Sequence, residues 1–185
     1  PVEQKRIARL RFPERQRQKI ASYAYLRYLL GFYLNKDPRE LCFTYHKFGK
    51  PYLQGVPLEF NLSHAQNKLL LAFAAEFPLG IDLEYHKANR DCLKLAQRFF
   101  SAKEVLALEA LKGRDLVKGF YQLWSSKEAV LKAWGRGLNF PLKNLSISLD
   151  QDTAEAPKLW ALKEAGVHAK DCQLFNLPQI ENFSA

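Results

Sequence analysis

Gly80-Ile81-Asp82-Leu83-Glu84 alternates apolar and acidic residues, which is the pattern of a half-buried β-strand. Successive side chains of a strand point to opposite faces, so Ile81 and Leu83 are expected in a core while Asp82 and Glu84 share the other face. The sequence therefore predicts two carboxylates that point the same way.

A second stretch, Trp124-Ser125-Ser126-Lys127-Glu128-Ala129-Val130-Leu131-Lys132, has the spacing of an amphipathic helix. Glu128 and Lys132 stand four residues apart, so their side chains meet on one side of that helix. Together with Asp82 and Glu84, Glu128 gives three carboxylates, a set that suits a hard cation such as Mg²⁺ with waters and substrate phosphates in its shell. The combination indicates chemistry on a phosphate ester or anhydride.

Each piece also has an ordinary explanation. An alternation of this kind most often forms a strand with one solvated face, and Glu128 with Lys132 alone is usually a surface pair worth roughly 0.2–0.5 kcal/mol. Lys127 shifts the balance, because it falls near the middle of an apolar stripe and an unpaired buried charge is costly. Lys127 must therefore snorkel or bind an anion, either a carboxylate or a ligand phosphate. The stripe consists of Phe120, Leu123, Trp124, Val130, Leu131 and Trp134.

Helical and strand patterns are segregated along the chain, which predicts an α+β fold rather than a doubly wound parallel sheet. Helical spacing covers residues 15–34, 91–99, 102–111 and 115–134. Strand patterns cover residues 41–45, 58–62, 69–75, the carboxylate stretch after a turn at 78–80, and 144–149, 158–162 and 173–177, while 46–57 reads as a loop.

These residues resemble the 4′-phosphopantetheinyl transferases, and specifically the surfactin-synthetase-activating type. That family carries a Gly-Ile-Asp-x-Glu strand and a Trp-Ser-x-Lys-Glu-Ala-x-x-Lys helix, and both stand here without gaps. The resemblance runs from roughly Arg9 to Ser148. The further matching motifs are Gly49-Lys50-Pro51-Tyr52, Phe60-Asn61-Leu62-Ser63-His64, Arg98-Phe99-Phe100-Ser101 with Glu104, and Gly135-Arg136-Gly137-Leu138.

The resemblance implies a fold of two similar lobes in a pseudo-dimeric arrangement, with the active site at the lobe interface. Residues 1–78 would form the N-terminal lobe, with coenzyme A nucleotide contacts, and residues 79–185 the C-terminal lobe, with the metal and catalytic residues. The hinge would lie around residues 77–80. The protein is expected to be a monomer.

The resemblance also implies the reaction, which is transfer of 4′-phosphopantetheine from coenzyme A to a serine of an apo acyl or peptidyl carrier protein, with release of adenosine 3′,5′-bisphosphate. Asp82, Glu84 and Glu128 would hold Mg²⁺, and Glu128 would accept the serine proton directly or through a water. Lys132 would neutralise or protonate the leaving bisphosphate. Asp82, Glu128 and Lys132 are thus the expected catalytic residues, and Lys127 would steady the cluster of phosphates and carboxylates.

The remaining coenzyme A contacts are implied by the N-terminal motifs. Lys50 would approach the nucleotide, because Gly49 removes a side chain and Pro51 stiffens the turn. Ser63 and His64 would meet the 3′-phosphate at a strand end. One or two members of a basic cluster, with Lys19 among the candidates, would touch the same phosphate. The cluster consists of Arg9, Arg11, Arg15, Arg17 and Lys19.

The composition agrees with a folded chain that has anionic partners. The 185 residues are 48% hydrophobic and 13% aromatic, enough for a sizeable core. The net charge of +9 fits nucleic acid, but also coenzyme A and an acidic carrier protein. No membrane-length apolar run or signal-peptide pattern is present, so a cytoplasmic protein is expected. Cys42, Cys92 and Cys172 lack the spacing of a disulfide framework or zinc site.

Two alternatives from other classes stay open. A nucleic-acid-binding protein would share the basic charge and interleaved aromatics, although three aligned carboxylates would repel a phosphate backbone. A catalytically idle relative that only binds coenzyme A or a carrier protein would share the motifs. The sequence does not distinguish carriers of fatty-acid, polyketide and nonribosomal-peptide synthesis, and no nucleic-acid or membrane partner is expected.

Overall fold

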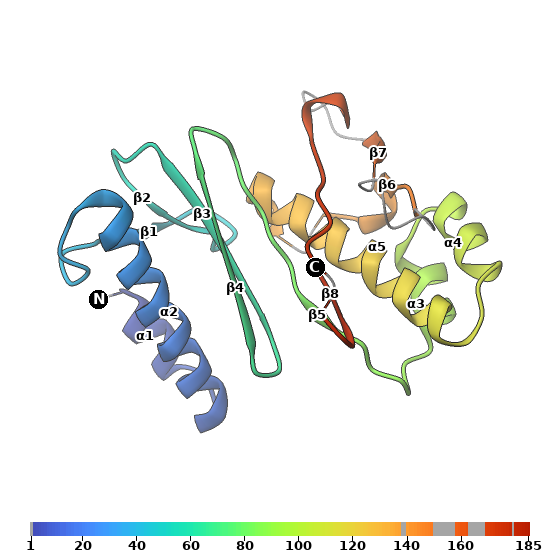
Figure 1. Cartoon of the computed structure of the whole chain (residues 1–185), viewed down its shortest axis with the longest axis horizontal. Helices are drawn as coiled ribbons and strands as arrows, with labels where there is room; N and C mark the ends of the chain where they lie inside the picture. The colour runs from blue at the N-terminus through green and yellow to red at the C-terminus, as the bar shows by residue number, and fades with distance from the viewer. Residues whose placement is uncertain (1, 138–139, 150–157, 163–168, 179) are drawn as a thin grey trace.

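The computed structural model describes residues 2–137, 140–149, 158–162, 169–178 and 180–185, and Figure 1 shows them as two halves side by side. The N-terminal half joins two helices to two antiparallel hairpins. Its elements are α1 (Val2–Ala8), α2 (Pro13–Leu34), β1 (Phe43–Tyr45), β2 (Pro51–Leu53), β3 (Leu58–Ala65) and β4 (Lys68–Ala75).

The C-terminal half is arranged around one long helix, α5 (Gly113–Trp134), with β5 and β8 on one side of it and α3, α4, β6 and β7 on the other (Figure 1). Gly135 ends this helix in the left-handed conformation with φ 65°, a conformation that glycine adopts without steric cost. The other elements are β5 (Glu84–Tyr85), α3 (Cys92–Phe99), α4 (Ala102–Glu109), the 3₁₀ turns η2 (Leu142–Asn144) and η3 (Ala169–Asp171), β6 (Leu145–Ile147), β7 (Leu159–Leu162) and β8 (Phe183–Ser184).

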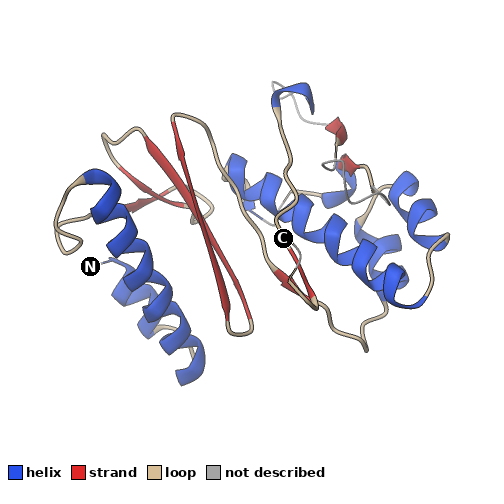
Figure 2. Ribbon diagram, viewed as in Figure 1, coloured by secondary structure: helices blue, strands red, loops and turns tan. Residues whose placement is uncertain are grey.

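All strand pairs of the described residues are antiparallel, which agrees with an α+β chain, and these residues contain no parallel pair of the kind that a doubly wound sheet has (Figure 2). β1 pairs with β2, β3 with β4, β5 with β8, and β6 with β7. Among the described helices, none is both long and apolar enough to cross a membrane.

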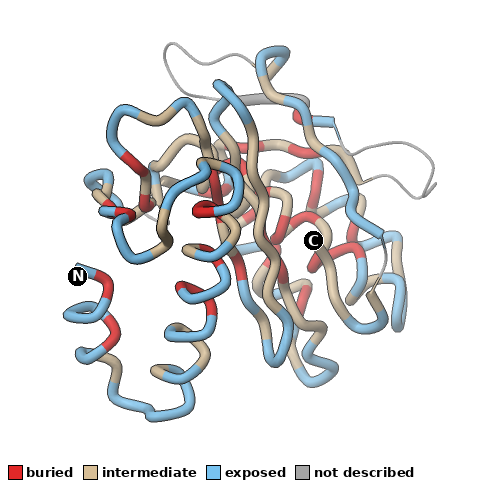
Figure 3. The backbone as a smooth tube through the Cα atoms, turned by 60° about the vertical axis from the view of Figure 1, so that its left-hand side comes forward, coloured by how far each residue is buried: buried red, intermediate tan, exposed pale blue. Residues whose placement is uncertain are grey.

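Each half has its own hydrophobic core, and the buried segments of Figure 3 follow these cores. The N-terminal core packs α1 and α2 against β1, β2 and β3, with Leu26 and Leu30 of α2 fully buried. The C-terminal core packs α3, α4 and the β6–β7 hairpin around α5, with Phe120, Tyr121 and Leu123 fully buried. Two separate cores leave a junction between the halves, and the candidate site lies along that junction.

The helices and most strands fall where the sequence predicts them, with four exceptions. α1, β2 and β8 were not predicted, because a seven-residue helix rich in charge and strands of two or three residues carry little periodicity. The strand predicted at residues 173–177 is wrong, because that segment has no strand partner among the described residues and β8 pairs with β5 instead. Of the Gly135-Arg136-Gly137-Leu138 motif, Leu138 lies outside the described residues.

The carboxylate stretch is extended, but only Glu84 and Tyr85 belong to a strand. The backbone N–H groups of Ile81 and Leu83 donate to side chains of β3, namely Asn61 Oδ1 at 3.0 Å and Ser63 Oγ at 3.1 Å. Side chains of β3 therefore take the place of a neighbouring strand. This explains why the observed strand is shorter than the one that the sequence pattern predicts.

Gly80 brings the same stretch into direct contact with α5. A Cβ atom at Gly80 would lie 1.9 Å from Ala129 O and 2.4 Å from Ala133 N, both of which are backbone atoms of the helix. No side chain larger than hydrogen fits at this position unless the extended stretch or α5 moves. The glycine thereby sets how closely the carboxylates of the stretch approach those of α5.

We expect Gly80→Ala to destabilise the protein by about 3 kcal/mol or more, because backbone atoms cannot yield to the added methyl group. Gly55→Ala is the control. Gly55 has φ 71°, and a Cβ atom added there would have no atom of the surrounding structure within 4 Å, so the only cost is backbone strain of about 1–2 kcal/mol in the left-handed conformation. Urea denaturation followed by circular dichroism measures both. Equal losses for the two variants would contradict the close approach.

Candidate active site between α5, β3 and β5

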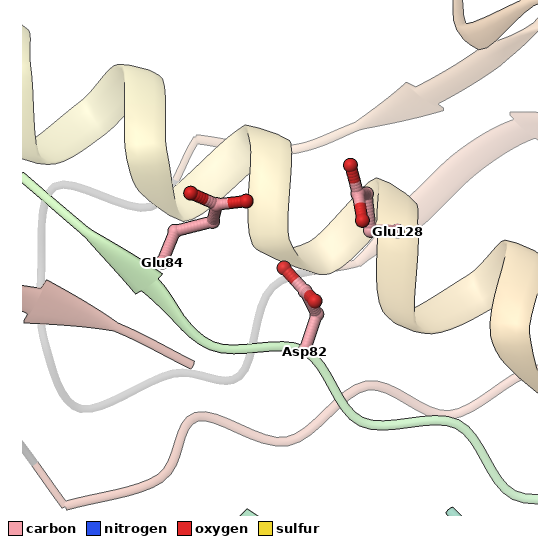
Figure 4. Close-up of side chains that lie close together, drawn as sticks. All are labelled: Asp82, Glu84 and Glu128. Carbon is pink, nitrogen blue, oxygen red and sulfur yellow. The ribbon is translucent and has the colours of Figure 1, made fainter. Parts of the chain in front are cut away.

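Three carboxylates from distant parts of the chain meet at the junction of the two halves. Figure 4 shows Asp82 and Glu84 on the extended stretch that faces α5, and Glu128 on α5 itself. One oxygen of each carboxylate lies within 4.8 Å of the others. The structure thus brings together the three residues that the sequence predicted as metal ligands.

Asp82 is the most constrained of the three, with 4% of its surface exposed. Its Oδ1 atom accepts hydrogen bonds from Ser63 Oγ at 2.9 Å and from Lys132 Nζ at 2.6 Å. Its Oδ2 atom is buried and has no hydrogen-bond partner among the residues that the structure describes. A buried carboxylate oxygen without a partner is costly, so this atom is an open ligand position.

The three negative charges disfavour one another in this setting. Burial, followed by the charge of Asp82, raises the pKa of Glu128 to about 7, although Lys132 and a hydrogen bond from Trp124 act in the opposite direction. Burial and the charge of Asp82 also raise the pKa of Glu84. A divalent cation would relieve this repulsion, and an all-carboxylate oxygen donor set is the kind that Mg²⁺ takes. The residues present therefore fit a Mg²⁺ ion.

Lys132 connects the cluster to both halves of the molecule. It stands one helical turn after Glu128, and its ammonium donates to Ser63 Oγ at 3.0 Å and to Ile81 O at 3.1 Å in addition to Asp82. Its side chain is still 30% exposed. Lys132 therefore lies at the surface of the cavity described next, where it can meet an anion.

A pocket of about 590 Å³ opens beside the cluster and takes its walls from both halves. Glu128 and Lys132 line it from α5, while Lys19 lines it from α2. Burial lowers the pKa of Lys19, and the nearby charges of Lys132 and Arg6 lower it further. Such a concentration of positive charge is expected to attract a polyanion.

His64 lies at the edge of the same positive region. Burial lowers the pKa of its imidazole, and the charges of Lys19, Lys132 and Arg15 lower it further, while Asp82 raises it slightly. Of the predicted basic cluster, Lys19 lines the pocket and Arg15 acts on His64, whereas Arg17 pairs with Glu14 at the surface. Arg9 and Arg11 are exposed.

Ser63 and Lys50 lie at the site, but their polar atoms are held by the protein. Ser63 is 6% exposed, and its hydroxyl donates to Asp82 and accepts from Lys132 and the Leu83 N–H. Lys50 lines the pocket, and its ammonium donates to three protein oxygens. The structure therefore gives both residues contacts that the sequence did not predict.

Lys127 points away from the cluster. Its ammonium is fully buried, 2.8 Å from Glu104, and donates to the carbonyls of Leu142 and Leu145. Burial lowers the pKa of Lys127, and Glu104 opposes that shift. The prediction that Lys127 needs an anion is confirmed, but its anion is a carboxylate of the C-terminal core, and the structure does not bring Lys127 to the three-carboxylate cluster or the pocket.

Two functional contacts escaped the sequence reasoning. Arg6 lines the pocket from α1, a helix that carries no clear periodic signal. Trp124 Nε1 donates to Glu128 Oε1 at 2.9 Å and orients that carboxylate. The second contact could have been found, because residues four apart on a helix are neighbours.

Comparison with known proteins places this geometry in a family. The family model described as "4'-phosphopantetheinyl transferase superfamily" matches residues 78–159. 4′-Phosphopantetheinyl transferase HetI of Nostoc sp. strain PCC 7120 is 37% identical over 166 residues, which cover 86% of this chain and 70% of that protein.

Two further relatives differ in how much of their length is matched. 4′-Phosphopantetheinyl transferase Sfp of Bacillus subtilis strain 168 is 38% identical over 63% of this chain, and a phosphopantetheinyl transferase of Thraustochytrium sp. is 26% identical over 83% of it. The matched part spans 51% of the Bacillus protein and 58% of the Thraustochytrium protein. With the identity and coverage of the HetI match, these comparisons show that the chain belongs to the 4′-phosphopantetheinyl transferase superfamily.

Proposed function

We propose that this chain transfers 4′-phosphopantetheine from coenzyme A to a serine of an apo carrier protein and releases adenosine 3′,5′-bisphosphate. The observation that carries the proposal is the open Asp82 Oδ2 atom in a three-carboxylate cluster beside a basic pocket that Glu128 also lines. A metal-dependent reaction of a polyanionic donor needs this combination of acidic and basic groups. The complete set also favours an active enzyme over an idle relative.

Asp82, Glu84 and Glu128 are the residues that would hold Mg²⁺. When bound, the ion would supply charge neutralisation to the pyrophosphate of coenzyme A. Asp82 contributes Oδ2, because Oδ1 is occupied by Ser63 and Lys132. The hydrogen bond from Trp124 keeps Glu128 directed toward the cluster.

The chain's own groups can move the protons of the transfer. The carrier serine oxygen forms a bond to the phosphorus next to pantetheine, and the bond from that phosphorus to the bridging oxygen breaks. Glu128 accepts the serine proton directly or through a water. Lys132, one turn on, stabilises the negative charge of the departing adenosine 3′,5′-bisphosphate.

The nucleotide part of coenzyme A would occupy the basic pocket. Lys19 and Arg6 approach it from the N-terminal half, and His64 stands where the field of Lys19 and Arg15 converges. We assign the 3′-phosphate to this region, since an anion there relieves the mutual repulsion of buried cations. Nucleic acid is a poorer candidate, because the positive groups line a pocket beside carboxylates.

The same proposal covers the organisation of the molecule. Residues 1–78 would form a nucleotide-binding lobe and residues 79–185 a catalytic lobe, in the pseudo-dimeric arrangement of the family, and the two separate cores support this division. All three carboxylates and the pocket walls come from one chain, which supports a monomer. The cytoplasm, where coenzyme A and apo carriers occur, is the proposed location, with no nucleic-acid or membrane partner.

The activity is testable with a panel of apo carriers from fatty-acid, polyketide and nonribosomal-peptide synthesis. Mixed with coenzyme A and Mg²⁺, at least one carrier should gain the mass of one phosphopantetheine on its serine, and chelation of the metal should stop the gain. Intact-protein mass spectrometry reads the result. The enzyme proposal fails if no carrier gains mass while a known transferase modifies the same panel.

Asp82→Asn and Glu128→Gln should each lower turnover at least about 100-fold, because each removes a metal ligand and a charge that balances the cation. Glu84→Gln should lose less, since a water can replace its oxygen. Glu109→Gln, on an exposed carboxylate of α4, is the matched control and should turn over normally. Rates measured across a Mg²⁺ titration, with circular dichroism as a folding check, decide the matter. Wild-type turnover by Asp82→Asn would refute the metal assignment.

His64→Ala should raise KM for coenzyme A about tenfold with little change in kcat, because a hydrogen bond to a charged phosphate contributes about equally in ground and transition states. The effect should vanish with dephospho-coenzyme A, which lacks the 3′-phosphate. Steady-state kinetics with both donors make the comparison. Equal losses with the two donors would show that His64 does not contact that phosphate.

A further inference from the structure

Lys50 makes contacts that do not fit a simple ligand-binding lysine. Its side chain is 8% exposed, although it lines the pocket. The ammonium donates to Glu59 Oε2 at 3.0 Å, Leu79 O at 2.9 Å and Ala133 O at 3.2 Å. An ammonium has three N–H donors, so these oxygens use its whole donor capacity and leave none for a phosphate.

The three oxygens come from three different parts of the fold. Glu59 lies on β3, Leu79 lies in the connection between the halves, and Ala133 lies in the last turn of α5. Lys50 itself lies between Gly49 of the turn and Pro51, the first residue of β2. One buried charge therefore joins both halves and the connection between them.

The contact with Ala133 also completes the end of α5. The last carbonyls of a helix have no partner within it, and they carry partial negative charge. The N–H groups of Gly135 and Arg136 bond the carbonyls of Leu131 and Lys132. Lys50 supplies a donor to Ala133 O, with a full positive charge at the negative end of the helix dipole.

A second lysine, Lys132, donates a hydrogen bond to the same connection two residues later. Lys50 holds the carbonyl of Leu79, Lys132 holds the carbonyl of Ile81, and Gly80 between them touches the backbone of α5. The connection leads directly into Asp82, whose carboxylate Lys132 also binds. Loss of the Lys50 hydrogen bonds would let the connection and the last turn of α5 move relative to each other.

We propose that Lys50 is a positioning residue: it fixes the connection at Leu79 to the end of α5, so that Asp82 and Lys132 stay in register across the junction. This role rests on the proposed function for its kinetic consequence, but the structural part stands without it. Lys50 acts through its protein contacts and does not bind the nucleotide with its ammonium.

Lys50→Met keeps the length of the side chain and removes its donors. By hydrogen exchange and mass spectrometry of the protein without substrates, peptides covering residues 79–84 and the last turn of α5 should exchange at least about fivefold faster than in the wild type. Lys47→Met, on an exposed lysine of the same turn, should leave these peptides unchanged. Glu59→Gln, which leaves both carbonyl contacts in place, should give a smaller effect in the same segments. This second variant serves if Lys50→Met fails to fold.

Kinetics and binding separate positioning from ligand contact. In Lys50→Met, kcat should fall at least about tenfold, while calorimetry should find the Kd for adenosine 3′,5′-bisphosphate within threefold of the wild type. A Kd that rises tenfold or more with unchanged exchange would overturn the proposal and make Lys50 a direct ligand. Unchanged exchange at residues 79–84 in both Lys50→Met and Glu59→Gln would also overturn it. An inactive wild type would refute the proposed function alone. The positioning role would still be tested, because hydrogen exchange is measured without substrates.

Discussion

The contact of Lys132 with Asp82 and Ser63 is the interaction on which the site depends. It joins β3 of the N-terminal half, the connecting stretch and α5 in one hydrogen-bonded group, with a 2.6 Å ion pair at its centre. By occupying Oδ1 of Asp82, it leaves Oδ2 as the oxygen that is buried and open. The pair therefore joins elements of both halves at the candidate site.

The balance of charge across the junction follows from that contact. Asp82, Glu84 and Glu128 lie close together, and Lys132 lines a pocket with Lys19 and Arg6, so carboxylates and cations each lie near charges of their own sign as well as near one another. Burial is the main cause of the raised pKa of Glu128 and of the lowered pKa of Lys19, and in each case neighbouring charges of the same sign add to the shift. The fold holds groups of like charge close together. A metal ion and a polyanion would each reduce this electrostatic repulsion, so the site is less stable empty than with both bound.

The sequence predicted the features that depend on local spacing. The shared faces of Asp82 with Glu84 and of Glu128 with Lys132 follow from periods of two and of 3.6, and the C-terminal ends of α2 and α5 were predicted correctly, whereas both helices begin two residues earlier than predicted. Roles that depend on partners distant in sequence were not predictable. Glu104 is far from Lys127 in the sequence, and Ala133 is far from Lys50, so no local pattern connects the members of either pair. The wrong strand at 173–177 has the same cause, because a strand exists only where another edge accepts it.

Lys127 and Glu128 are neighbours on α5, so their side chains leave the helix about 100° apart. Lys127 is tied to Glu104 and to the carbonyl of Leu142 inside the C-terminal core. The helix therefore cannot rotate about its own axis without withdrawing a buried ammonium from its partners. The direction of the Glu128 carboxylate is in this way set by packing on a different side of the helix. Substitutions in the core around Glu104 would therefore change the angle at which Glu128 faces Asp82 and Glu84 without removing a carboxylate from the cluster.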